Sequence, residues 1–244
     1  MSVMQRIKSR FQNEQFRPGW LGIFINPFWL ARRELYQTLQ ELAPRLHGNI
    51  LDIGCGTLPY RELFTNASDY TGMEYDSPIG RAKSGATIFY DGKHFPVSDQ
   101  SYQSILLSQV LEHIFWPDDF LEECHRILKQ DGTLLLSVPF VWDEHEIPYD
   151  YARYSSYGLR HLLEKNGFRI LEQRKTLADF RVIVQLFQAW LYKFMQPRAG
   201  HKITSLLLSW LSILALLLYR LLPKNPDLYL DNIILATRMD TKTP

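Results

Sequence analysis

The chain has 244 residues, which is long for one compact domain and short for two, so we expect one domain with accessory segments. Hydrophobic residues make up 46% and charged residues 22%, a globular composition that excludes wholesale disorder and low-complexity fibres. A formal net charge of +1 at first sight excludes a strongly nucleic-acid-binding surface.

That charge is unevenly distributed along the chain. Residues 1–33 carry +5 and residues 181–226 carry +6 with no acidic residue, whereas residues 34–180 carry −9. Basic, aromatic-rich flanks around an acidic middle indicate an anionic partner, for which a membrane surface fits as well as nucleic acid.

Cysteine usage and the N-terminus bear on the compartment. The two cysteines, Cys55 and Cys124, are too few for a disulfide framework, and no pair of CxxC motifs suggests a zinc site. We therefore expect a reducing compartment and no metal. The basic N-terminal residues are followed by no apolar stretch of signal-peptide length, which favours a cytoplasmic protein.

Apolar strand patterns alternate with helical patterns through the middle of the chain. The expected strands are residues 49–53, 70–74, 87–90, 104–108, 133–138 and 168–171, and the expected helices are residues 117–129 and 156–165. This alternation predicts an α/β fold with a parallel, doubly wound sheet. The last expected strand, residues 228–237, follows after more than 50 residues, so that interval must hold structure of its own.

The first expected strand runs directly into a glycine turn, Gly54-Cys55-Gly56. In an open α/β sheet such a turn lies at the ligand-binding edge, although a lone G-x-G occurs as readily without a ligand. A dinucleotide fingerprint needs a third glycine where Pro59 stands, and the Gly-Lys-Ser/Thr of a P-loop is absent. Glu74 lies about 20 residues further on, where a carboxylate accepts hydrogen bonds from ribose hydroxyls. We expect a ligand with a ribose and without a pyrophosphate.

Five motifs, in this order, resemble the class I S-adenosylmethionine-dependent methyltransferases of the small-molecule, type 11 branch. They are LDIGCG, YTGMEYD, DGKHFPVSDQSY, SQVLEHI and RILKQDGTLLLSVP, between residues 48 and 138. Residues 145–168 and the string NPFWLARRELYQTL resemble a narrower bacterial branch that is often encoded with surface-polysaccharide genes. The resemblance implies a Rossmann-like, seven-stranded, mainly parallel sheet with an antiparallel last strand, and S-adenosyl-L-methionine as the cofactor.

The resemblance also assigns cofactor-binding residues: Asp52, Gly54, Cys55, Gly56, Glu74, Asp91, Gly92 and Gln109. It implies that Asp52 faces the methionine ammonium group, that Glu74, or less plausibly Asp76, binds the ribose, and that Asp91 accepts from the adenine amino group. Gly92 would pack on the adenine ring and Gln109 would line the methionine side. Two departures, Gln103 in place of the usual Asp and Gln130-Asp131-Gly132 in place of the Pro-Gly-Gly turn, leave cofactor binding intact.

Methyl transfer needs positioning, and a general base as well when the acceptor is a hydroxyl. The catalytic candidates His113, His145 and Asp150 follow the fourth and fifth expected strands, and so lie at the ligand-binding edge. We choose His145 first as the base, while a backbone-bonded structural role for His113 is as open as an active-site role. Residues 142–154 interleave acids with aromatic residues and are expected to cover the substrate. Cys55 has no histidine partner, so we interpret it as a packing residue.

Residues 203–219 form an uncharged stretch of 17 residues, preceded by an amphipathic helical pattern. As a helix it would be about 26 Å long, slightly short of the hydrocarbon core of a bilayer. Either it is one arm of a helical hairpin with its tip at residues 196–202, or it lies shallowly in the membrane interface, which the composition favours. Ser205, Ser209 and Ser212 share one face and suit close helix packing. The alternative is a soluble homodimer interface or an extra core layer.

Shallow burial assigns the charged and aromatic residues of this segment to the lipid surface. Arg181, Lys193, Arg198, Lys202 and Arg220 would face lipid phosphates, and Trp190, Tyr192, Trp210 and Tyr219 would lie at headgroup level.

We divide the chain into a basic helical segment (residues 1–47), an S-adenosylmethionine-binding domain (48–180), an apolar, basic helical insertion (181–226), and a final strand with the tail (227–244). We expect a methyltransferase that acts on an O or N atom of a small-molecule, glycan or lipid-linked acceptor and does not bind nucleic acid. The insertion at residues 181–226 would place it peripherally at the inner face of the membrane. The alternatives are a non-catalytic, membrane-associated adaptor with the same fold and, less favoured, a dinucleotide oxidoreductase.

Overall fold

A computed structural model describes residues 14–240 of the chain. The contacts divide the described residues into two compact units: unit 1 comprises residues 14–39, 141–143 and 175–231, and unit 2 comprises residues 40–140, 144–174 and 232–240. Residues 14–39 of the predicted N-terminal segment thus belong to the same unit as the helical insertion, and residues 40–47 belong to the other. Arg6, Lys8 and Arg10 of the basic N-terminal flank lie outside the described residues.

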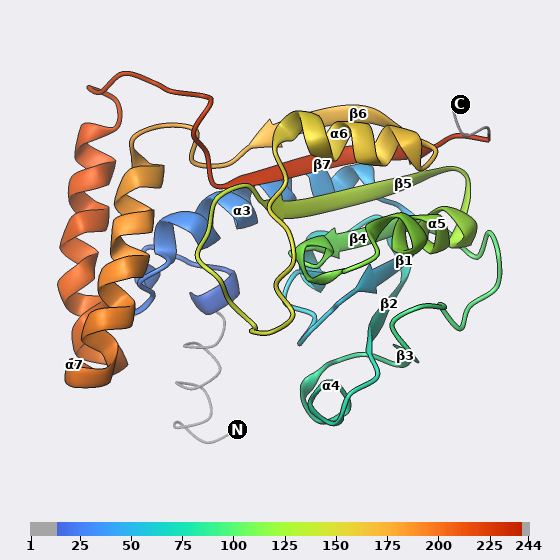
Figure 1. Cartoon of the computed structure of the whole chain (residues 1–244), viewed down its shortest axis with the longest axis horizontal. Helices are drawn as coiled ribbons and strands as arrows, with labels where there is room; N and C mark the ends of the chain where they lie inside the picture. The colour runs from blue at the N-terminus through green and yellow to red at the C-terminus, as the bar shows by residue number, and fades with distance from the viewer. Residues whose placement is uncertain (1–13, 241–244) are drawn as a thin grey trace. The chain divides into compact units, whose positions relative to one another are not determined.

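Unit 2 is built on a seven-stranded sheet in the order β3-β2-β1-β4-β5-β7-β6. The strands are β1 (Gly48–Ile53), β2 (Ala67–Tyr75), β3 (Ile88–Tyr90), β4 (Tyr102–Ser108), β5 (Leu128–Pro139), β6 (Phe168–Lys175) and β7 (Asp231–Arg238). The first five strands pair in parallel, and β7 runs opposite to its two neighbours (Figure 1). The predicted α/β sheet with an antiparallel last strand is confirmed.

The helices of unit 2 are determined by the residues at their ends and by their apolar faces. They are α4 (Pro78–Lys83), α5 (Pro117–Ile127) and α6 (Ser156–Lys165), with the short 3-10 helices η1 (Ala43–Arg45), η2 (Arg61–Leu63) and η3 (Leu111–His113). In α5, Pro117 occupies the first position and two aspartates the first turn, where the helix dipole favours negative charge. Its apolar face is buried in the main core of the unit.

The segment Gln130-Asp131-Gly132 differs from the turn that we expect between α5 and β5. It lies inside β5, where Asp131 has a φ of 55° and the pairing with β4 shifts register between Tyr102 and Ser104. The extra residues are accommodated as a bulge, so the strand begins directly at the end of the helix.

Unit 1 contains α2 (Gly22–Ile25), the first part of α3 (Trp29–Leu42) and α7 (Arg181–Leu218). Helix α7 is a hairpin of two arms that lie side by side (Figure 1), because Gly200, with φ 74° and ψ 161°, breaks the helix. Between the arms, Gln188 Nε2 donates to Leu208 O and to Ser212 Oγ, both at 2.8 Å. Ser205, Ser209 and Ser212 are buried between the arms, so their predicted role in close packing is confirmed.

Candidate active site

The glycine turn after β1 is tightly packed on one side and open on the other. Gly54 has a φ of +67°, and a Cβ there would lie 2.4 Å from Val110 Cγ2, so the position requires glycine. The N–H groups of Gly54 and Cys55 both donate to Met73 O, at 2.9 and 3.2 Å, and tie the turn to β2. At Gly56, with φ +48°, a Cβ would meet nothing within 4 Å. The backbone at Gly56 therefore borders open space that a ligand can approach closely.

Glu74, near the end of β2, holds its carboxylate beside this turn. Gly56 N–H donates to Glu74 Oε2 at 3.0 Å, and Tyr75 N–H donates to Oε1 at 3.1 Å. Each carboxylate oxygen keeps a further acceptor position for a hydroxyl donor. Asp76 is engaged instead by Arg81, whose Nε and Nη2 donate to it at 2.5 and 2.8 Å. The geometry thus favours Glu74 over Asp76 as the ribose-binding residue.

A single cleft of about 1530 Å³ extends from the glycine turn along the carboxyl ends of the strands. Of the predicted cofactor-binding residues, those that line it are Gly54, Gly56, Glu74, Gly92 and Gln109. Most ligand pockets have about 300–1,000 Å³, so the cleft has room for a cofactor and a second small molecule. Thr57, Tyr75 and Ile79 also line it and were not among the predicted residues.

Asp52 and Cys55 are buried behind the turn and do not line the cleft. Tyr70 Oη donates to Asp52 Oδ2 at 2.7 Å, and burial raises the pKa of Asp52 to about 7, with the charge of Glu74 adding to the rise. The contact of Asp52 with an ammonium group stays a prediction. Burial likewise raises the pKa of the Cys55 thiol to about 12, in keeping with the packing role that we predict.

Asp91 shapes the loop after β3. Its Oδ1 accepts the N–H groups of Lys93 and His94, both at 2.9 Å, and these backbone hydrogen bonds lower the pKa of the carboxyl. Asp91 does not line the cleft, and its contact with adenine stays a prediction. Gly92 has a φ of +92°, and a Cβ there would lie 3.2 Å from the Tyr75 ring, so glycine lets the loop pass close to that ring.

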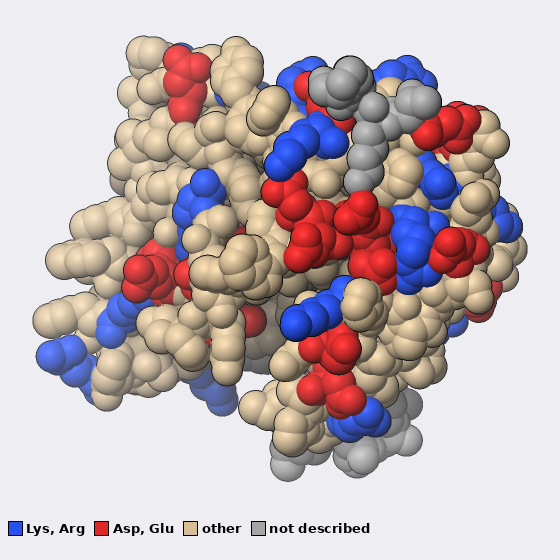
Figure 2. Space-filling view, turned by 45° about the vertical axis from the view of Figure 1, so that its right-hand side comes forward, with Lys and Arg blue, Asp and Glu red and all other residues tan. Residues whose placement is uncertain are grey.

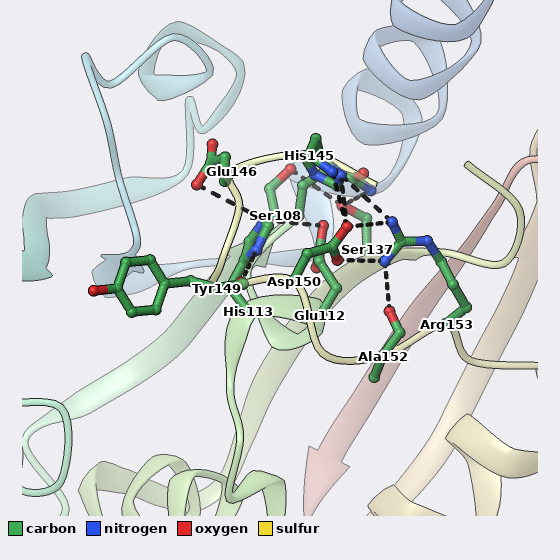
Figure 3. A network of polar contacts seen from close by, with 11 residues as sticks. Ser108, Glu112, His113, Ser137, His145, Glu146, Tyr149, Asp150, Ala152 and Arg153 are labelled. Carbon is green, nitrogen blue, oxygen red and sulfur yellow. Dashed lines mark hydrogen bonds and ion pairs between the residues drawn. The ribbon is translucent and has the colours of Figure 1, made fainter. Parts of the chain in front are cut away.

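His113 also lines the cleft, and His145, which is not among the lining residues, packs against it (Figure 3). Their rings lie 4.9 Å apart between centroids at an angle of 77°. His113 belongs to η3, and its Nδ1 lies 2.7 Å from Tyr149 O, so a proton on Nδ1 leaves the lone pair on Nε2. His145 belongs to the loop after β5, where its Nδ1 lies 3.3 Å from Asp150 Oδ2 and 3.4 Å from Arg153 Nη2.

Asp150 is held by hydrogen bonds from Arg153 and from the backbone of His145. Arg153 donates from Nη1 to Oδ1 and from Nη2 to Oδ2, both at 2.6 Å, and the N–H of His145 donates to Oδ2 at 3.0 Å. The Arg153 guanidinium holds the pKa of the Asp150 carboxyl well below its usual range. Arg153 thus holds an ionised Asp150 beside His145, and the catalytic role of Asp150 stays a prediction.

Glu112, which stands directly before His113 in the SQVLEHI motif, was not among the predicted site residues. Its side chain is fully buried, and its Oε1 lies 3.9 Å from His113 Nε2. Glu146 Oε2 lies at the same distance from that nitrogen, on the exposed side. Its place next to a candidate histidine in the sequence is the signal from which Glu112 could have been predicted.

The loop that we expect to cover the substrate divides between the two units. Trp142 packs edge-on against Phe28 inside unit 1, with 5.7 Å between ring centroids, and Tyr154 packs against the core of unit 2. Only Tyr149 and Tyr151 of the four aromatic residues line the cleft. The covering role therefore narrows to these two tyrosines.

Comparison with known proteins agrees with this geometry. Residues 29–173 match the family described as a methyltransferase domain. The chain belongs to this methyltransferase family. A probable S-adenosylmethionine-dependent methyltransferase of Mycolicibacterium smegmatis is 27% identical over 168 residues, which cover 66% of this chain and 62% of the relative. An uncharacterized methyltransferase of Mycolicibacterium gilvum is 27% identical over 186 residues, which cover 71% and 68%. The aligned part thus spans about three-fifths of the first relative.

Solved structures confirm the methyltransferase fold. The phosphoethanolamine N-methyltransferase 2 of Haemonchus contortus, in complex with S-adenosyl-L-methionine, superposes with a TM-score of 0.54 at 16% identity, over 93% of this chain and 59% of that one. The [4+2]-cyclase SpnF superposes with a TM-score of 0.55 at 18% identity, over 86% and 83%. Because a cyclase shares the fold, these superpositions carry the fold alone. The family and the relatives indicate that the cofactor is S-adenosylmethionine, as predicted.

Proposed function

We propose that the protein transfers a methyl group from S-adenosylmethionine to an O or N atom of a small, glycan or lipid-linked acceptor at the inner face of the cytoplasmic membrane. The observation that supports the transfer is the cleft, which is lined by the glycine turn, by Glu74 and by His113, with His145 packed against His113. A non-catalytic adaptor would have no use for a cleft with these chemical groups.

The residues beside the glycine turn fit S-adenosylmethionine. The open space beside Gly56 admits a ligand against the backbone, and the Glu74 carboxylate lies within hydrogen-bonding distance of the same turn. Gln109 and Gly92 line the remaining wall. When bound, the cofactor supplies an electrophilic methyl group on a sulfonium, so the protein has to hold the acceptor and manage its proton.

Beside His113, His145 is the candidate general base. A histidine oriented by a carboxylate that is itself fixed is a recurring arrangement for proton transfer, and Asp150 with Arg153 supplies it here. His113, tied by Nδ1 to the Tyr149 carbonyl, turns Nε2 toward Glu112 and Glu146. Both histidines lie where an acceptor hydroxyl would lose its proton.

Cofactor binding is tested by isothermal titration with S-adenosylhomocysteine. We expect the wild type to bind and Glu74→Ala to bind at least tenfold more weakly, because two ribose hydroxyls lose their acceptor. Asp69→Ala, which removes an exposed carboxylate from the other end of the same strand, is the matched control and should bind like the wild type. Absence of binding by the wild type would overturn the proposed activity.

The acceptor is sought with a mass-labelled methyl group. The protein is incubated with methyl-labelled S-adenosylmethionine and cell-envelope extracts, and labelled products are identified by mass spectrometry. We expect label in a glycan or lipid fraction, and a 10²- to 10⁴-fold lower rate for His145→Ala. If label enters only protein or nucleic acid, the proposed acceptor class is wrong.

The α7 hairpin supports membrane association because its polarity is reversed relative to a soluble helix pair. Polar side chains such as Gln185, Gln188 and Thr204 are fully buried in unit 1. The exposed large apolar residues are Ile183, Phe187, Trp190, Phe194, Ile203, Leu206, Leu207, Trp210, Leu214 and Leu217. Polar contacts between helices and apolar side chains outside are typical of helices in lipid. Within residues 14–240, α7 is the one helix that contains an 18-residue window apolar enough for a membrane span, and the mean hydropathy of that window is 1.7.

The basic residues of the hairpin narrow the expected lipid contacts. Arg181 is largely buried and pairs with Glu34 at 2.5 Å and with Asp179 at 2.8 Å, so it holds unit 1 together instead of facing lipid phosphates. Lys193 pairs with Asp143 at 2.6 Å. The exposed Arg198, Lys202 and Arg220 are left for anionic headgroups. Tyr192 is likewise engaged, by His201 at 2.9 Å, and Tyr219 lies beneath Arg181.

Flotation with liposomes tests the membrane contact. We expect the wild type to rise with vesicles of phosphatidylethanolamine and phosphatidylglycerol, and the variant Leu206→Glu/Trp210→Glu to stay at the bottom, because both side chains are exposed on the apolar face. Tyr157→Glu, at an 83% exposed position of α6, is the control and should float. A wild type that stays at the bottom and sediments as a dimer would favour the soluble homodimer.

A further inference from the structure

We infer that Glu112, His113 and His145 form a binding site for one divalent transition-metal ion, in which His113 lines the cleft. One ligand atom from each of these residues lies within 4.8 Å of the others. Two imidazoles and one carboxylate are a donor set that zinc and ferrous iron take in proteins, with coordination positions left open for a substrate. The inference rests on the proposed function only for the role of the ion, because binding itself is measured separately.

The distances are close to those of a bound ion. His113 Nε2 lies 3.9 Å from Glu112 Oε1 and 3.9 Å from Glu146 Oε2. Metal bonds of about 2.0–2.2 Å place two ligands of a tetrahedral ion roughly 3.4 Å apart. The two pairs at 3.9 Å therefore need to contract by about half an ångström, and the widest pair of the three ligand atoms, up to 4.8 Å apart, by up to about 1.4 Å. Glu146 is exposed and on the cleft side, where it would serve as a fourth ligand or give way to an acceptor.

In each histidine the protein engages Nδ1, so Nε2 is the nitrogen that we assign to the ion. Nδ1 of His113 faces the Tyr149 carbonyl, and Nδ1 of His145 faces the Asp150 carboxylate. A metal-ligating histidine typically donates its other ring N–H to a carbonyl or a carboxylate in this way, which fixes the tautomer and the orientation of the ring. Two hydrogen bonds from Arg153 fix the Asp150 carboxylate beside His145.

The backbone fixes the loop against η3 before any ligand arrives. The N–H groups of Tyr151 and Ala152 both donate to Glu112 O, at 2.9 and 3.2 Å. The segment that carries His145 and Glu146 is thereby attached to the segment that carries Glu112 and His113. Glu112 is fully buried, and a cation beside it would offset the cost of burying its charge.

An ion at this position defines the acceptor class. It would bind an acceptor hydroxyl and lower the pKa of that group, so that the proton leaves to solvent and the oxygen is presented to the cofactor as an anion. Open coordination positions favour an acceptor with two neighbouring oxygens, such as a vicinal diol or a hydroxy acid. With an ion bound, His145 is a ligand, and the ion replaces it in activating the hydroxyl.

The test is metal binding to the full chain after dialysis against a chelator. We expect Zn²⁺ to bind at one ion per chain by isothermal titration, and Co²⁺ to give a visible absorption band at the same stoichiometry. His113→Ala, His145→Ala and Glu112→Gln should each weaken Zn²⁺ binding at least tenfold, and His161→Ala, on the exposed face of α6, should not. No saturable binding by the wild type, or equal binding by His113→Ala, would overturn the site.

Titration with S-adenosylhomocysteine separates this site from the proposed function and checks the fold. His145→Ala should lose Zn²⁺ binding and keep S-adenosylhomocysteine binding, whereas Glu74→Ala should show the reverse. A wild type that binds Zn²⁺ and no S-adenosylhomocysteine keeps the metal site and refutes the methyltransferase activity. If His145→Ala and Glu112→Gln bind S-adenosylhomocysteine normally and also bind Zn²⁺ normally, the metal site is refuted while the activity stands.

Discussion

The packing of Gly54 against Val110 gives a quantitative prediction about the glycine turn. An alanine at position 54 has to adopt a φ of +67°, which costs about 1–2 kcal/mol in the left-handed region. Its Cβ would also lie 2.4 Å from Val110 Cγ2, and such overpacking costs about 1–3 kcal/mol. We therefore expect Gly54→Ala to lower the free energy of unfolding by about 2–5 kcal/mol.

Gly56→Ala separates the two contributions. Gly56 has a φ of +48°, and no atom lies within 4 Å of the Cβ position, so this substitution should cost only the conformational part, about 1–2 kcal/mol. Its methyl group points into open space beside the turn, where we expect the cofactor. The loss of S-adenosylhomocysteine affinity should therefore be larger than the small loss in free energy of unfolding indicates. Urea unfolding followed by circular dichroism, with a parallel titration of S-adenosylhomocysteine, measures both effects.

A double-mutant cycle with Val110→Ala tests the cause directly. Val110→Ala removes Cγ2, so Gly54→Ala should be less destabilising in that background, by about 1–2 kcal/mol. No such coupling should appear between Val110→Ala and Gly56→Ala. Equal costs for the two glycine substitutions, or additivity of Gly54→Ala with Val110→Ala, would refute the steric argument.

Three further predictions concern pH and the hairpin. Burial raises the pKa of Asp52 from 3.8 to about 7. The protonated carboxyl therefore contributes fully to stability below pH 3.8, and this contribution, roughly 4 kcal/mol, is lost as the pH rises to about 7. In urea unfolding, the free energy of unfolding of Asp52→Asn should decline less over that pH range than that of the wild type. Arg126 lowers the pKa of Glu123, so that contribution is lost as the pH falls below about 4.5, and Glu123→Gln should unfold with a weaker dependence on acid. Gln188→Met removes the hydrogen bonds to Leu208 O and Ser212 Oγ. The free energy of local opening of α7 should fall by about 1–2 kcal/mol, which hydrogen exchange measures as faster exchange of its amides.

The strands of the sheet were predictable because buried parallel strands read as apolar runs. SILLS in β4 and TLLLSV in β5 are such runs, and the glycine turn with Glu74 about 20 residues beyond it follows from the geometry of the first two strands. The start of β5 was not predictable, because its bulge carries polar residues that on sequence indicate a turn. Local patterns thus determine where a strand runs, and the pairing with a neighbour determines where it begins.

The arrangement of the two histidines was only partly predictable, because it depends on the path of a loop. Position in the chain placed His113 and His145 at one edge of the sheet, but their contact depends on the hydrogen bonds from Tyr151 and Ala152 to the Glu112 carbonyl. The pairing of Asp150 with Arg153 is similar, because a spacing of three residues in a loop fixes no mutual orientation. Both arrangements are properties of tertiary structure.

The uneven charge of the chain has a consequence for membrane binding that the net charge hides. Acidic side chains gather on the face that Figure 2 shows, with Lys and Arg between them. Several acidic residues of the chain form ion pairs, such as Glu123 with Arg126. Two basic residues of the hairpin, Arg181 and Lys193, are also paired. At about 1 kcal/mol for each basic residue near an anionic surface, the remaining cations contribute only a few kcal/mol. In the proposed membrane contact, burial of the exposed apolar side chains of α7 would supply most of the affinity, and binding to vesicles should persist when salt screens the charges.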